Sequence, residues 1–167
     1  MFCLNENSAP AGVTSEERAT YPRPVVEPTV EGASRLGSLY WEEVERFMRG
    51  VVRAHASRDG LQLRIPGGPV LLGFRGPLLD VSDGHVTCLY DITGGLLARA
   101  PGGQISFHQE GSGPTQVRSA IADYHPRLGA RPRRPRWFGA LYQHVQVRVH
   151  VAISRQYFAR LAREARA

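Results

Sequence analysis

The sequence of 167 residues contains no lysine, so all 21 basic side chains are arginines. A net charge of +6 and a pI of about 10.0 would ordinarily suggest a nucleic-acid partner. An arginine-only bias is instead typical of a GC-rich coding source, because arginine codons are GC-rich and lysine codons are not. The charge is therefore weak evidence for a basic function, and we expect most arginines to be solvated or paired with the 15 acidic residues.

Long apolar runs and cysteines are also scarce. No stretch approaches the roughly 20 apolar residues of a membrane-spanning helix, and the N-terminus lacks the pattern of a secretory signal. The two cysteines, Cys3 and Cys88, do not make a disulfide framework, and Cys88 is expected to be a small buried apolar side chain. These absences favour a cytoplasmic protein without a membrane span.

Motifs of the common catalytic and cofactor-binding families are missing. The chain has no Walker A loop, no dinucleotide-binding glycine fingerprint, no Gly-x-Ser-x-Gly elbow and no His-Glu-x-x-His. The Gly-Gly pairs are expected to be turns. His144 and His150 would lie about 20 Å apart on one strand at ~3.3 Å per residue, or on different sides of a helix. We therefore expect neither a cofactor nor a metal.

The organisation predicted from composition is an arm followed by one domain. Residues 1–33 contain four prolines and few clustered apolar residues, which is typical of a flexible arm. Residues 34–167 are expected to form a single α+β domain. It begins with a helix from about Ser38 to Ala56, because Ser38 is a suitable N-cap and apolar residues recur after it at helical spacing.

Short apolar segments separated by glycine-rich turns follow this helix. Their spacing is typical of antiparallel strands, and the connections are too short for parallel crossovers. The predicted strands are 61–65, 70–74, 78–81, 85–92, 96–100, 104–109 and 116–124.

The C-terminal segment supports two interpretations. Residues 144–151 alternate apolar and polar, as a half-buried strand does, but apolar residues also recur every four positions from Leu141 to Leu161. One interpretation is a single long helix from about Trp137. The other, which four alternating valines favour, is a strand to Ile153 followed by a helix from Arg155.

The predicted fold class is α+β, with an N-terminal helix, a curved antiparallel sheet of about six to eight strands and a C-terminal helix. This architecture resembles the helix-grip and cystatin-like cone folds, although no motif matches either family. The resemblance implies an internal pocket for an apolar ligand.

Polar residues that interrupt apolar strand faces are the candidate catalytic groups. Asp123 lies on the strand face of Val117, and Tyr90 on that of Cys88. Burial would raise the pKa of the Asp123 carboxyl and suit it to proton transfer. His125 and His108 are candidate hydrogen-bond donors beside them. Each of these residues also has an ordinary structural explanation, as a strand end, a core tyrosine or a surface histidine.

An arginine-rich loop is the second candidate site. Residues 127–136 combine arginines and prolines next to Trp137, a composition that binds phosphate or single-stranded nucleic acid. The alternative is a solvated loop in an arginine-biased protein. The candidate anion-binding residues are Arg131, Arg133, Arg134 and Arg136.

These features lead to one principal hypothesis and two alternatives. The first is a small pocket protein that binds a hydrophobic or aromatic small molecule. Its finer form is a cofactor-independent isomerase, cyclase or dehydratase that transforms this molecule. In that hypothesis Asp123 is the base. The second is a non-enzymatic protein that binds nucleic acid or an acidic partner through the arginine loop. The third is an oligomeric subunit, such as a homodimer, formed through a strand edge or the arm.

Overall fold

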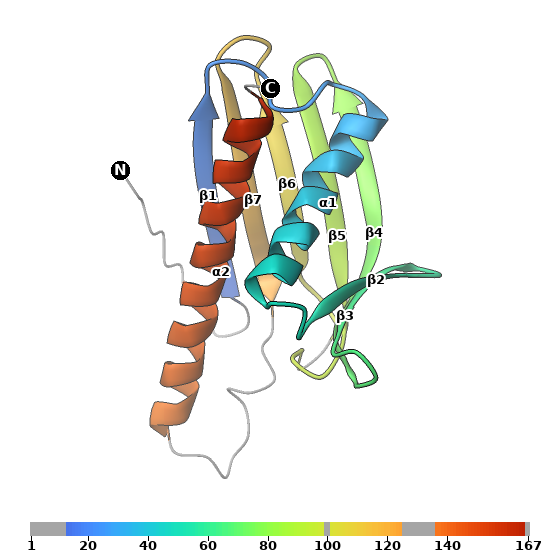
Figure 1. The fold of residues 1–167 in the computed structure, drawn as a ribbon, viewed down its shortest axis with the longest axis vertical. Helices are drawn as coiled ribbons and strands as arrows, with labels where there is room; N and C mark the ends of the chain where they lie inside the picture. Colours follow the sequence, from blue (N-terminus) through green and yellow to red (C-terminus); the bar gives the residue numbers. More distant parts are fainter. Residues whose placement is uncertain (1–12, 99–100, 125–135, 166–167) are drawn as a thin grey trace.

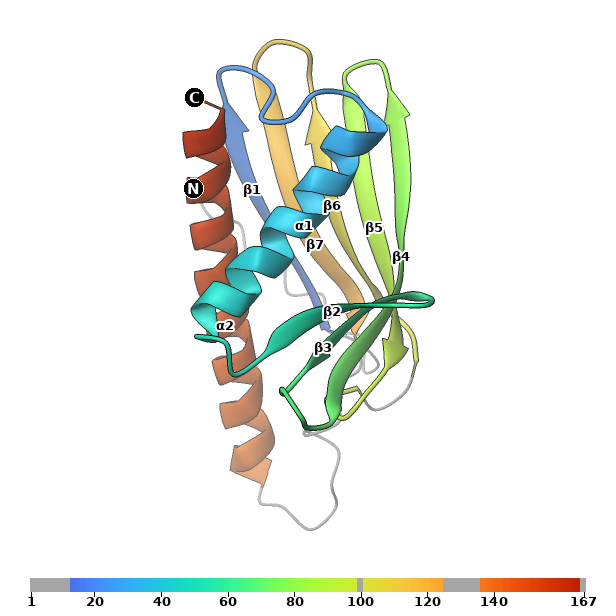
Figure 2. The same cartoon turned by 45° about the vertical axis from the view of Figure 1, so that its right-hand side comes forward.

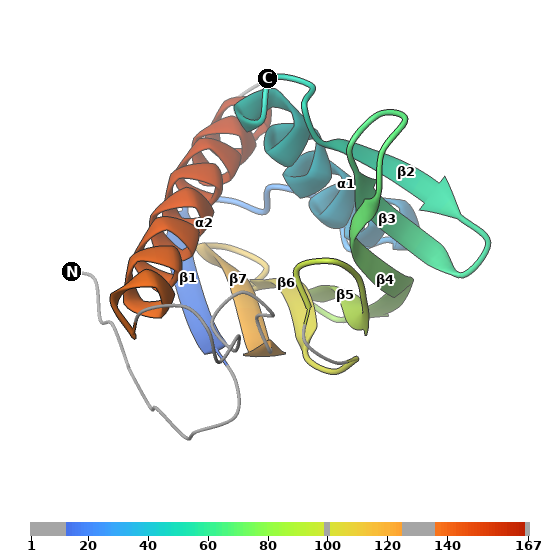
Figure 3. The same cartoon turned by 90° about the horizontal axis from the view of Figure 1, so that it is seen from below.

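The computed structural model describes residues 13–98, 101–124 and 136–165, apart from the side chains of Val13 and residues 136–147. Within these residues the chain forms a curved sheet and two helices, which lie together on its concave face (Figures 1 and 3). In chain order, the elements are β1 (Val13–Tyr21), α1 (Val30–Phe47), β2 (Arg53–Ser57), β3 (Gly60–Arg64), β4 (Val70–Ser82), β5 (His85–Gly94), β6 (Gln104–Glu110), β7 (Thr115–Tyr124) and α2 (Arg136–Glu164).

The seven strands form one antiparallel sheet in the order β1-β7-β6-β5-β4-β3-β2. The β2–β3 hairpin curls across the lower end of the sheet, and α1 crosses the middle (Figure 2). The predicted fold class is therefore confirmed. The C-terminal helix α2 packs beside α1 and contacts the edge strand β1.

Helix α1 lies further towards the N-terminus than expected. Its N-cap is Thr29, whose hydroxyl accepts a hydrogen bond of 3.0 Å from the Gly32 amide, and not Ser38. The helix ends before Arg49 and Gly50, which both have positive φ. The bounds predicted from the sequence were wrong at both ends, because glycines inside the helix disguised its first turns and β2 begins where the helix was expected to continue.

Gly37 shows why a glycine occurs in the middle of α1. A Cβ atom at this position would lie 2.6 Å from the Cys88 sulfur and 2.9 Å from the Tyr90 hydroxyl oxygen. Glycine is a weak helix former, but here it lets the helix backbone approach β5 closely. Cys88 is a free, buried thiol, as the sequence predicted.

The segment expected to be an arm contains the edge strand β1. Residues 13–21 pair with β7, and Tyr21 is buried against the core with its hydroxyl donating to the Phe158 carbonyl. The linker that follows is held by the buried Gln109 side chain, which bonds the Val25 and Val26 amides and the Val26 carbonyl. The prolines concealed this strand, because Pro10 precedes it and three more prolines follow it, which gave residues 1–33 the composition of a flexible arm. Residues 1–12 are outside the described residues.

The structure differs from the predicted strands in two places. Strand β4 continues through Gly76-Pro77, where its pairing with β5 shifts register instead of stopping. The strand expected over 96–100 is reduced to a single bridge at Ala98, and its last two residues lie outside the described part of the chain.

The C-terminal segment is one long helix, α2, so the favoured strand-then-helix interpretation was wrong. Ile153, Tyr157 and Leu161 recur every four residues and are all buried. The four-residue spacing therefore prevailed over the β propensity of the valines, because a helix buries this whole stripe against α1 and the sheet.

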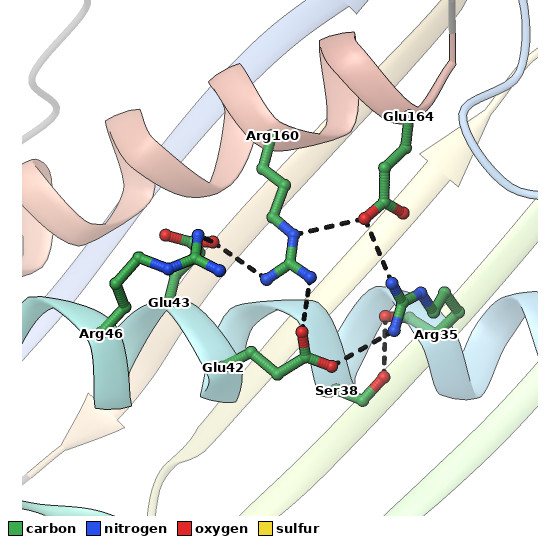
Figure 4. A network of polar contacts seen from close by, with 7 residues as sticks. All are labelled: Arg35, Ser38, Glu42, Glu43, Arg46, Arg160 and Glu164. Carbon is green, nitrogen blue, oxygen red and sulfur yellow. Dashed lines mark hydrogen bonds and ion pairs between the residues drawn. The ribbon is translucent and has the colours of Figure 1, made fainter. Parts of the chain in front are cut away.

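An ionic network joins α2 to α1 (Figure 4). At its centre Arg160 contacts Glu42, Glu43 and Glu164, and the Glu43 side chain is only 2% exposed. Arg35 bridges Glu42 and Glu164 on the solvent side. Because a buried carboxylate needs a charged partner, Glu43 fixes where the two helices meet.

Candidate functional site

Aromatic side chains fill the concave face of the sheet beneath α1. Tyr40 lies 4.8 Å from Phe107 between ring centroids, and Trp41 lies 4.9 Å from Phe74. Tyr90 and Tyr157 complete the cluster in edge-to-face contacts. This part of the concave face is a packed core, so a ligand would have to lie at its margin.

A group of polar side chains lies at that margin, where α1, α2, β1 and β7 meet. Two come from the sheet, one from α1 and two from α2. We call this group the buried polar cluster, and its members are Glu17, Tyr40, Ser119, His150 and Ser154.

Strand and helix periodicity bring these residues together. Glu17 on β1 is directly opposite Ser119 on β7, and Ser119 is in turn opposite the core residue Phe107 on β6. Residues two apart share a strand face, so Glu17 points inward with Tyr21. On α2, His150 and Ser154 are four residues apart and therefore face the same way.

The Tyr40–His150 pair is the most deeply buried part of the cluster. The Tyr40 hydroxyl oxygen lies 3.0 Å from Nδ1 of His150. Burial lowers the pKa of His150 to about 4, so the imidazole is neutral at pH 7. Burial also raises the pKa of Tyr40 well above its usual value, with a smaller contribution from the charge of Glu17.

These protonation states indicate which nitrogen carries the imidazole proton. A buried phenol needs an acceptor, and Nδ1 of His150 is the one within reach of Tyr40. When Tyr40 donates to Nδ1, the single proton of the neutral ring is on Nε2. The pair therefore presents an N–H donor at Nε2.

Glu17 adds a carboxyl group to the same cluster. It is half-buried, and burial raises its pKa, while the nearby Ser154 hydroxyl and Arg155 guanidinium oppose that rise. No hydrogen bond of ordinary length reaches the Ser154 oxygen within the described residues, so its effect on Glu17 is that of a nearby dipole.

Three polar atoms of the cluster have no hydrogen-bond partner among the described residues. They are the hydroxyl oxygens of Ser119 and Ser154 and Nε2 of His150, all buried. An unsatisfied buried polar group costs about 1–3 kcal/mol, so such groups are rare unless something else binds them. Their concentration in one cluster marks it as the candidate site.

The catalytic residues predicted from the sequence do not come together. Tyr90 is buried on the concave face among Trp41 and Phe74, whereas His108 lies on the opposite face, bonded to Thr87. Asp123 is exposed at the end of β7 with φ of 52°. His108 therefore does not point towards the concave face, and a catalytic role for Tyr90, His108 and Asp123 stays a prediction.

Other predicted site residues lie outside the description. His125, Arg131, Arg133 and Arg134 are outside the described residues, and of Arg136 only the backbone, at the start of α2, is described. Nucleic-acid binding by the arginine loop and homodimer formation also stay predictions.

The buried polar cluster itself was missed. Glu17 lies within the segment expected to be an arm, and His150 was considered only as a metal ligand. The available signal for an inward-facing Glu17 carboxyl group was strand periodicity. Every second residue of a strand shares one face, and the face that carries Glu17 also carries Ala19 and Tyr21.

Among the described residues, no group of three or more histidine, cysteine or acidic side chains is placed to hold a metal ion. Nor does any helix in the described part of the chain have the length and apolar character needed to cross a membrane.

Comparisons with known proteins add little to this description. No protein-family model matches the chain, and no curated protein sequence does. A similar solved structure is the crystal structure of Ara h 8.0201, with 16% sequence identity and a TM-score of 0.41, covering 88% of this chain and 98% of that one. At this level of similarity, the candidate site depends on the geometry described above.

Proposed function

We propose that the protein binds an apolar small molecule carrying a hydrogen-bond-acceptor oxygen, next to the buried polar cluster. The observation that carries this proposal is the buried Nε2 of His150, which has no partner within the described residues. A ligand oxygen that accepts from Nε2–H would satisfy a donor that the described chain leaves unsatisfied.

The surroundings of the cluster support an apolar ligand body. Ile153 is buried beside His150 on α2, and Val149 and Ile121 are only partly buried although they pack against the core. Apolar walls with a few convergent polar groups are typical of small-molecule sites. The low pKa of His150 favours a neutral acceptor, such as a carbonyl group, because the ring has no positive charge to offer an anion.

A matched ligand pair tests the proposal. Benzophenone and diphenylmethane have similar shapes, but only the ketone has an acceptor oxygen. We expect calorimetric titration to show that benzophenone binds about tenfold more tightly, as a hydrogen bond of about 1.5 kcal/mol implies. His150→Leu should remove this difference while diphenylmethane still binds.

His108→Leu on the convex face is the matched control and should leave both affinities unchanged. Equal binding of the two ligands to the unaltered protein would contradict the role of His150. Loss of ketone binding in Asp123→Asn or Tyr90→Phe, with His150→Leu unaffected, would move the site to the residues predicted from the sequence.

The finer proposal is that the site moves a proton on its ligand, as a cofactor-independent isomerase or cyclase does. The half-buried Glu17 carboxyl group supports this, because burial raises its pKa above the ordinary value of a glutamate and makes it a stronger base. The Nε2–H of His150 would then stabilise the enolate oxygen that forms when a proton leaves the carbon beside a ketone.

Hydrogen exchange on a bound ketone tests this step separately from binding. In D2O, the protein should accelerate exchange of the protons at C1 of 2-tetralone, measured by NMR. Glu17→Gln should abolish the acceleration, whereas Glu16→Gln, the neighbouring residue on the other face of β1, should retain it. An unchanged rate in Glu17→Gln would leave a binding protein without this chemistry.

A further inference from the structure

A cationic groove runs along the outer side of the junction between α1 and α2, away from the buried polar cluster. It has a volume of about 820 Å³. Arg46, Arg49 and Arg163 line it together with the apolar side chains of Phe47, Ala159 and Ala162. The groove therefore combines an apolar floor with basic walls.

The charges of the groove are only partly neutralised. Glu43 is its one acidic lining residue, and this carboxylate is already bound by Arg46 and by Arg160 (Figure 4). Arg49 and Arg163 are exposed and have no acidic partner among the described residues. Two guanidinium groups thus remain available to an anionic partner.

The basic surface continues beyond the groove. The Arg53 guanidinium lies 3.5 Å from the position of a Cβ atom on Gly50, next to Arg49. Arg53 also lines a second hollow of about 510 Å³ on the β2–β3 hairpin, with His55 and Arg64. A second arginine-lined hollow on the hairpin that follows α1 suits an elongated partner better than a single small anion.

We propose that this groove is a docking site for an acidic, amphipathic peptide segment of a partner protein. Carboxylates of the peptide would pair with Arg49 and Arg163, while its apolar side chains would contact Phe47 and the two alanines. Charge complementarity favours an acidic partner. The apolar floor favours a peptide over nucleic acid, because single strands stack on several aromatic side chains and this lining has one, Phe47.

Fluorescence anisotropy with a labelled synthetic peptide tests the proposal. The probe carries leucine on one helical face and glutamate on the other, and a second peptide has serine in place of every leucine. The leucine peptide should bind, and the double variant Arg49→Gln/Arg163→Gln should weaken this binding about tenfold, as two partly screened ion pairs imply. Ala159→Glu should weaken it as well, by placing a like charge in the groove.

The double variant Arg75→Gln/Arg148→Gln is the matched control, because it removes two exposed arginines outside the groove. It should change the affinity less than twofold. Equal weakening in the two double variants, or equal binding of the serine peptide, would overturn the proposal. So would a single-stranded oligonucleotide of equal charge that binds more tightly than the peptide and depends on Arg49 and Arg163.

Discussion

Titration of His150 should make the stability of the protein depend on pH in a defined window. Its pKa is about 4 in the folded protein and 6.5 for an unperturbed histidine. Between these values the unfolded chain binds a proton that the folded protein does not, so the free energy of unfolding falls as the pH falls. The full difference of 2.5 pH units corresponds to about 3 kcal/mol, of which about 2 kcal/mol is lost between pH 7 and pH 5.

Chemical denaturation at pH 7 and pH 5 measures this effect. The unaltered protein should lose about 2 kcal/mol more than His150→Leu over this interval, because leucine has no proton to bind. His55→Leu, which removes an exposed histidine from β2, should keep the pH dependence of the unaltered protein. If His150→Leu lost as much stability as the unaltered protein, the inference that His150 is buried and neutral would be refuted.

Substitutions of Tyr40 and His150 should show strong coupling in their effects on the free energy of unfolding at pH 7. Tyr40→Phe alone leaves the His150 ring without its one described partner and should destabilise the protein by about 1–2 kcal/mol. The double variant Tyr40→Phe/His150→Leu removes donor and acceptor together and should be close to neutral or stabilising. Additive effects in denaturation experiments would argue against a direct hydrogen bond.

Two further predictions concern how α1 is held. Gly37→Ala should destabilise the protein by about 1–3 kcal/mol, because the new methyl group would collide with β5. Gly113→Ala is the control, because a methyl group there meets open space, and it should be neutral within about 0.5 kcal/mol. Thermal unfolding distinguishes the two variants. Arg160→Ala should cost about 2 kcal/mol of stability, since it removes a partner of the buried Glu43 carboxylate. Arg163→Ala should have little effect. A similar loss in both variants in urea denaturation would contradict the role of the ionic network in joining the two helices.

The fold class could be predicted from the sequence because its evidence is local. Glycine-rich turns at short intervals separate the strands, and connections of a few residues permit only antiparallel pairing. Strands β5, β6 and β7 were placed to within two residues for this reason. By contrast, the β1 strand followed no such turn and was concealed by the prolines around it.

The candidate site could not be predicted in the same way. Glu17, Ser119 and His150 are far apart in the chain, and no local sequence pattern connects the three. Only the pairing of β1 with β7, and the packing of α2 across them, buries these side chains together. Burial then changes their chemistry, because it lowers the pKa of His150 and raises that of Glu17.

The sequence by itself determined an α+β domain of antiparallel strands flanked by helical segments, because side-chain periodicity and turn residues are properties of neighbouring positions. The tertiary structure decided whether residues 144–153 form a strand or a helix, since both periodicities were present and only burial against α1 and the sheet distinguishes them. It also decided which polar side chains lack partners, because hydrogen-bond satisfaction depends on groups brought together from distant parts of the chain.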